Sequence, residues 1–138
     1  MNKLVLLLSW FIISTSVSAQ NGTKLKGLET LAKQGDLAAQ IELANAYRKG
    51  IGVNQDYKTA IRWFSLAAEQ GNAEAQFNLG IMHKNLVYAH MWANQASSNG
   101  FEMGSELTEL LTELMTTNQI KQARKLGKEC MIKNYKGC

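Results

Sequence analysis

His83 and His90 are the side chains of this protein best suited to acid–base or metal chemistry. A histidine acts in catalysis when a nucleophile or carboxylate lies beside it, and it binds a metal when further ligands share its site. The sequence contains no Gly-x-Ser-x-Gly motif, no His-Glu-x-x-His motif and no phosphate-binding glycine loop after a strand. We therefore interpret both histidines as structural, and we predict that the chain is not an enzyme and uses neither a metal nor a cofactor.

Acidic and basic residues form two separate groups near the C-terminus. The glutamates step by four and three residues, as on one helix face, and lysines and arginines follow them. The glutamates are Glu102, Glu106, Glu109 and Glu113, and the basic residues are Lys121, Arg124, Lys125, Lys128, Lys133 and Lys136. Glutamates at this spacing could supply a general acid and base, and a basic helix could bind nucleic acid. We favour two solvated faces that pair across a helical hairpin, because Tyr135 is the only aromatic residue within the basic run.

Length and composition limit the chain to one small globular domain. It has 138 residues, 46% of them apolar, with no proline and a formal net charge of +4. This apolar content is too high for a disordered segment, and the lack of proline excludes collagen-like and proline-rich chains.

The N-terminus has the pattern of a secretory signal peptide. Lys3 precedes the apolar run 4–13, and small polar residues then lead to Val17-Ser18-Ala19. A retained membrane anchor is the less favoured alternative, because this run is about half of the roughly twenty residues that span a bilayer. We predict that residues 1–19 are removed and that residues 20–138 are exported to the periplasm without a stable membrane anchor.

An internal repeat organises the rest of the chain. A shift of 36 residues superposes Ala39-Gln40 on Ala75-Gln76, and beyond Lys84 a shift of 29 residues superposes Trp63 on Trp92. The second unit therefore lacks seven residues where the first has the segment 50–55. We expect the connection within the second unit to be much tighter.

Within each unit the apolar residues follow helical spacing, and strand signals are nearly absent. Gly50 and Gly71 stand where helices should end, and Asp56 and Asn72 where helices should begin. The expected helices are a single one near 24–34 and pairs at about 37–49 and 56–70, 73–84 and 87–98, and 103–115 and 118–133. Since one hairpin cannot bury both its faces, the pairs should stack into a short right-handed all-α solenoid. We expect Trp63 and Trp92 to fill the wider spaces between successive hairpins.

The repeat resembles the Sel-one-like repeat (SLR), which is similar to the tetratricopeptide repeat. The resemblance rests on Ala39-Gln40-x-x-Leu43, Gly50-x-Gly52-Val53-x-x-Asp56-Tyr57 and Ala67-Ala68-x-Gln70-Gly71, and on Ala75-Gln76-x-x-Leu79-Gly80 in the second unit. It implies repeats at about 35–70 and 71–99 and a capping helix pair at 101–138, and it implies a protein-binding function.

The two cysteines can be placed with the same register. A shift of 63 residues superposes Cys130 on Ala67 and Cys138 on Ala75, two alanines that should pack where one helix ends and the next begins. Such an approach suits a disulfide, and export would supply an oxidising compartment. We predict a Cys130–Cys138 disulfide, as in the cysteine-rich secreted proteins that the chain resembles.

Helical solenoids bind partners on the concave face, which is lined by the first helix of each hairpin. We predict that the residues of those helices left free by the repeat pattern bind a protein partner. These residues are Glu42, Asn45, Arg48, Phe77, Asn78, Ile81 and Lys84.

Three functions are compatible with such a module. The favoured one is a monomeric periplasmic binding protein, for example an immunity protein that neutralises an antibacterial effector such as a lipase of a type VI secretion system. The second is an adaptor or structural component of the cell envelope. The third, which we favour least, is an enzyme that binds or hydrolyses β-lactams.

Overall fold

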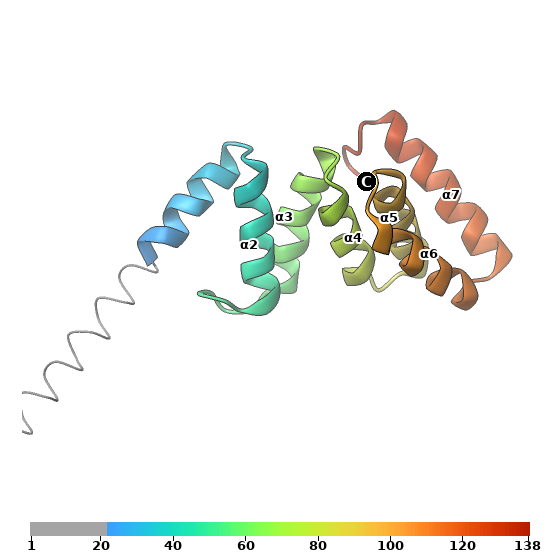
Figure 1. Ribbon diagram of the computed structural model, residues 1–138, viewed down its shortest axis with the longest axis horizontal. Coiled ribbons are helices and arrows are strands. Elements are labelled where there is room, and N and C mark those ends of the chain that lie inside the picture. The colour runs from blue at the N-terminus through green and yellow to red at the C-terminus, as the bar shows by residue number, and fades with distance from the viewer. Residues whose placement is uncertain (1–21) are drawn as a thin grey trace, which may run out of the picture.

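The computed structural model describes residues 22–138, so the predicted signal peptide lies outside the described residues. Residues 22–33 are helical, and six further helices follow. They are α2 (Leu37–Lys49), α3 (Tyr57–Glu69), α4 (Ala73–Met82), α5 (Leu86–Ser98), α6 (Glu102–Leu114) and α7 (Thr117–Ile132). Figure 1 shows them as an elongated row of packed helices. The expected all-α solenoid is confirmed, and no strand occurs within residues 22–138.

Polar caps and glycines define the helix ends, as the sequence predicted. Asp36 accepts a hydrogen bond from the Ala39 amide at 2.7 Å, and Asn72 accepts one from Ala75 at 2.8 Å. These caps satisfy amides that have no partner within their own helix. Gly50 ends α2 with a φ of 71°, a left-handed conformation that glycine adopts at little cost.

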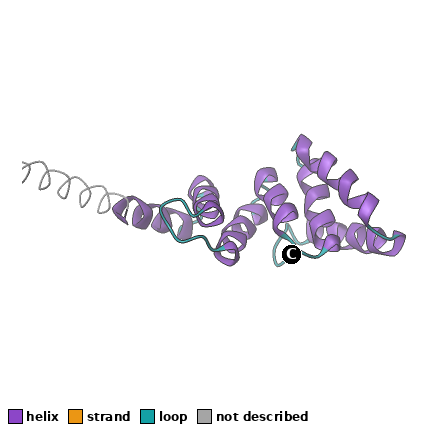
Figure 2. Cartoon of the chain, turned by 90° about the horizontal axis from the view of Figure 1, so that it is seen from below, coloured by secondary structure: helices purple, strands orange, loops and turns teal. Residues whose placement is uncertain are grey.

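The loops differ in length as the repeat shift predicted. The connection between α2 and α3 is the long loop on the left of Figure 2, whereas α4 ends at Met82 and α5 already begins at Leu86. The connection within the second unit is therefore much tighter, as expected.

The core lies between the hairpins and is centred on α5. Phe64, Leu43 and Leu79 are fully buried, and Trp92 lies in the same core as Phe64 and Leu79. Trp63 is only partly buried, whereas its neighbour Phe64 is completely enclosed. Trp63 nevertheless packs against two core clusters, one that contains Leu43 and one that contains Phe64 and Trp92, as expected of a side chain between successive units.

The last two helices depart from the expected hairpin. Both α6 and α7 pack against α5, but they hardly contact each other. Each of these helices contacts α5 through a glycine. Gly104 of α6 lies against the α5 backbone, and Gly127 of α7 lies beside the Gln95 side chain of α5. Because these contacts use different faces of α5, the two helices diverge, as Figure 1 shows.

The expected pairing of the glutamates of α6 with the basic residues of α7 is wrong. Within residues 22–138 the ion pairs are Lys24–Glu42 at 3.4 Å and Lys125–Glu129 at 4.0 Å. The separation of α6 from α7 explains this result, because glutamate and lysine side chains on diverging helices do not meet. Both charged faces are solvated.

Candidate binding grooves

A groove lies between the first and second hairpins, at the end of the row where α2 and α4 finish (the lower edge in Figure 1). We call it the second groove, and its volume is about 630 Å³. It is lined by Arg48, Tyr57, Ile61, Ile81, Met82, His83 and Lys84. Ile81 and Tyr57 are 56% and 57% exposed, so the second groove presents two large apolar side chains to solvent.

The long loop of the first hairpin positions one wall of this groove. Gln55 donates through Nε2 to the backbone oxygen of Arg48 at 2.8 Å and to the Tyr57 hydroxyl at 3.0 Å. One side chain thereby ties the end of α2 to the start of α3. Ile81 and Lys84 form the opposite wall, at the end of α4 and just beyond it.

A repeat-related groove lies one unit earlier, between the helical segment 22–33 and α2. We call it the first groove, and its volume is about 330 Å³. The 36-residue shift relates its Leu25, Asn45 and Ala46 to Ile61, Ile81 and Met82 of the second groove. Ile51 and Gly52 of the long loop also line the first groove. The second groove has no equivalent of this loop, because those residues are missing from the second repeat.

The charges of the two grooves differ as well. The first groove contains the Lys24–Glu42 ion pair, whereas Arg48 and Lys84 of the second form no ion pair within residues 22–138. The Arg48 guanidinium donates through one terminal nitrogen to Asn45 at 2.9 Å, and its Nε is buried with no hydrogen-bond partner. No carboxylate lines the second groove, so its positive charge is uncompensated.

The seven residues that the sequence assigned to one binding face fall into three places. Arg48, Ile81 and Lys84 meet in the second groove, and Glu42 and Asn45 line the first. The other two have intramolecular contacts. The Phe77 ring packs on the Phe101 ring with centroids 5.0 Å apart, and Asn78 donates to the backbone oxygen of Glu74. Sequence reasoning missed Tyr57, because we had treated its position as a repeat packing site.

The histidines occupy packed positions. His83 stacks on Tyr88 with ring centroids 5.7 Å apart, and burial lowers its pKa. His90 is 2% exposed, and its Nε2 lies 3.2 Å from the Thr112 hydroxyl of α6. Burial, and secondarily the positive charge of Arg124, lowers the pKa of His90. No group of three or more histidine, cysteine or acidic residues that could hold a metal occurs within the described part of the chain.

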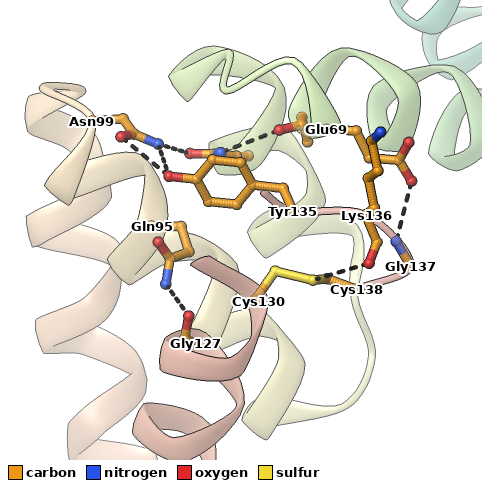
Figure 3. Close-up of a disulfide and its surroundings, with 11 residues drawn as sticks. Glu69, Gln95, Asn99, Gly127, Cys130, Tyr135, Lys136, Gly137 and Cys138 are labelled. Atoms are coloured by element: carbon orange, nitrogen blue, oxygen red, sulfur yellow. Dashed lines mark hydrogen bonds between the residues drawn. A yellow bond between two sulfur atoms is a disulfide. The ribbon is translucent and has the colours of Figure 1, made fainter. Parts of the chain in front are cut away.

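The predicted disulfide joins Cys130 and Cys138, whose α-carbons are 5.7 Å apart. It holds the C-terminal tail, which turns back toward the ends of α3 and α5 on the upper side of the row in Figure 1, and Figure 3 shows the disulfide and its surroundings. In this tail the Tyr135 side chain points toward Asn99, which donates to the Tyr135 hydroxyl at 3.1 Å. The tail thus attaches α7 to the turn after α5.

Buried glutamines join successive helices, a role that we did not predict from the Ala-Gln motif. Gln40 donates to the Ala32 oxygen and accepts from Gln70, and Gln76 donates to the Ala68 oxygen and accepts from Asn99. The repeat shifts relate the two sets, because Gln40 corresponds to Gln76 and Gln70 corresponds to Asn99. A polar residue repeated within an otherwise apolar helix face was the signal for this role.

The helix pairs, the equivalent glutamines and the equivalent grooves define an α-solenoid built from short repeats. The Sel1 repeat model matches residues 37–72 and 73–101. The chain belongs to the Sel1 repeat family.

The chain is similar to two solved structures and to a plant protein. One solved structure is that of c5321, a protective antigen of uropathogenic Escherichia coli strains with an SLR fold. Its sequence is 32% identical to this chain and the TM-score is 0.75; the match covers 80% of this chain and 25% of c5321. A second solved structure is a Sel1 repeat protein from Oxalobacter formigenes, which is 27% identical to this chain with a TM-score of 0.55. The match covers 83% of this chain and 98% of that protein. The HRD3B component of an ERAD-associated E3 ubiquitin-protein ligase of Arabidopsis thaliana is 37% identical over 39% of this chain. This chain spans only 9% of the length of HRD3B.

Proposed function

We propose that this chain is a non-enzymatic binding module that holds a protein partner in the second groove. The observation that carries the proposal is the groove itself, in which exposed Ile81 and Tyr57 lie beside unpaired Arg48 and Lys84. Tyrosine and arginine are among the residue types that dominate the energetics of protein interfaces. HRD3B, a relative of this chain, is named as a component of a larger ligase, which supports an assembly role.

The second part of the proposal is a periplasmic location. The signal-peptide pattern of residues 1–19 and the Cys130–Cys138 disulfide support it, because disulfides persist in oxidising compartments. No helix within residues 22–138 is long and apolar enough to span a bilayer. Expression of the full chain in a bacterium, followed by fractionation and N-terminal sequencing, tests this location. A periplasmic product that begins at Gln20 supports it, and an uncleaved cytoplasmic product contradicts it.

The third part is an immunity role, in which the partner is an antibacterial effector such as a type VI secretion lipase. A small exported binding module with a preformed groove could block such an enzyme stoichiometrically. The alternative partner is a subunit of an envelope assembly, which would make the chain an adaptor.

A pull-down from periplasmic extract with the wild-type chain and with Ile81→Asp as the matched control separates these roles. Ile81 is exposed, so its replacement should leave the fold intact. One stoichiometric toxin that wild type retains and the variant loses supports immunity, whereas an envelope-assembly subunit supports the adaptor. Hydrolysis of a β-lactam by the purified chain would contradict a non-enzymatic function. Sedimentation of the purified chain tests the proposed monomer.

A further inference from the structure

The second groove has a charge and shape that restrict what can occupy it. We propose that it binds a protein segment in which an aspartate or glutamate is adjacent to a large aliphatic or aromatic side chain. In this arrangement the carboxylate contacts Arg48 and Lys84, and the apolar side chain covers Ile81 and Tyr57. This inference rests on the proposed protein-binding function and specifies the chemistry of the partner.

The apolar half of the argument comes from exposure and volume. Tyr57 lies on α3 and Ile81 on α4, and the partly buried side chains of Ile61 and Met82 from the same two helices also line the groove. A volume of about 630 Å³ lies within the range of sites that enclose small ligands, and it is sufficient for one or two large side chains of a partner. Covering two half-exposed apolar side chains supplies a hydrophobic driving force.

The acidic half of the argument comes from groups without partners. The Arg48 guanidinium is held in place by Asn45 through one terminal nitrogen, and it forms no ion pair within residues 22–138. A carboxylate is the acceptor that matches a guanidinium best, because it can take two parallel hydrogen bonds. Lys84 adds a second unpaired cation at the rim, and Gln55 holds the wall that carries Arg48.

The first groove is an internal control for this argument. It has the same position in the repeat, and of its two lysines Lys24 is paired with Glu42 while Lys49 has no ion pair within residues 22–138. The position equivalent to the exposed Ile81 is the polar Asn45. It also has about half the volume of the second groove, 330 Å³ against 630 Å³. The first groove thus also presents an unpaired lysine and an exposed apolar side chain, Ile51, but a carboxylate of its own, Glu42, lies within it, whereas no carboxylate lines the second groove.

A phage-displayed library of random peptides, selected on the immobilised wild-type chain, tests the inference. Enriched peptides are then synthesised with a fluorescent label, and their affinities for wild type, Lys84→Gln, Arg48→Gln and Ile81→Asp are measured. The matched controls are Lys121→Gln and Leu114→Asp, which change exposed residues on α7 and α6 in the same ways. Thermal unfolding of every variant confirms that it folds.

We expect enriched peptides to carry an acidic residue next to leucine, isoleucine or an aromatic residue. Their affinity should fall about tenfold in Arg48→Gln, which removes a partly buried charged hydrogen bond, and about threefold in Lys84→Gln, which removes an exposed charge. Ile81→Asp should abolish binding, and the controls should match wild type. Enriched peptides that lack acidic residues, or that bind all variants equally, would overturn the inference. The broader proposal that the chain binds a protein, at another surface, would remain. No enrichment at all would count against both the inference and the proposed function.

Discussion

Alanine substitutions at four helical glycines test how closely the helices are packed, because the four sites differ in the space around the added methyl group. At Gly104 of α6 the new carbon would lie 2.5 Å from the Ser97 amide nitrogen and 2.7 Å from the Ala93 oxygen. Both atoms belong to the backbone of α5, so α6 could accommodate the methyl group only by moving away from α5. At Gly27 the added methyl group would meet nothing within 4 Å.

The expected changes in the free energy of unfolding follow from two opposing effects. Alanine is favoured over glycine in a helix by up to about 1 kcal/mol, which should appear in full for Gly27→Ala. Overpacking costs about 1–3 kcal/mol, and contact with rigid backbone places Gly104→Ala at the upper end of that range. The net loss for Gly104→Ala is about 2 kcal/mol, or a decrease in Tm of roughly 8 °C for a domain of this size.

The other two glycines should fall between these limits. At Gly80 the methyl group would lie 3.2 Å from two backbone atoms of α5, a contact that a small shift can relieve. At Gly127 it would lie 2.8 Å from Nε2 of the Gln95 side chain, which can move but would give up its hydrogen bond to the Gly127 oxygen. Overpacking in Gly80→Ala and the lost hydrogen bond in Gly127→Ala should each lower the free energy of unfolding by about 1 kcal/mol, as measured by urea unfolding. If Gly104→Ala were as stable as Gly27→Ala, the close seating of α6 on α5 would be wrong.

Three further predictions concern other parts of the fold. Cys138→Ser should lower the free energy of unfolding by about 2–3 kcal/mol, and a reductant should destabilise wild type by a similar amount but leave the variant unchanged. Phe64→Ala should cost about 3–5 kcal/mol, and Trp63→Ala should cost less because its ring is only partly buried; equal losses would contradict this order. The pKa of His90 lies below its ordinary value of about 6.5, so the unfolded chain takes up a proton near pH 6 that the folded chain does not. The free energy of unfolding should therefore decrease between pH 7 and pH 5, and His90→Gln should reduce that slope; an unchanged slope would assign the pH dependence to other groups.

Several features of this protein could be predicted from the sequence because they depend on residues close to one another. Helix ends follow from caps such as Asp36 and Asn72, which act on amides three residues away. The cysteine pair follows from the repeat register, which places Cys130 and Cys138 at the equivalents of Ala67 and Ala75, where one helix ends and the next begins. The shortened second connection is visible as a change of repeat shift from 36 to 29 residues. All of these interactions are local, so the chain specifies them without reference to distant helices.

Only the tertiary structure showed how the helices are arranged around α5 and which side chains meet between hairpins. The divergence of α6 from α7 depends on where Gly104 and Gly127 contact α5, and no pattern within the two helices encodes that choice. The meeting of Tyr57 with Ile81 and Lys84 likewise required the stacking of two hairpins. The physical reason is that helix formation depends on neighbours within about four residues, whereas packing angles depend on side-chain shapes contributed by several helices at once.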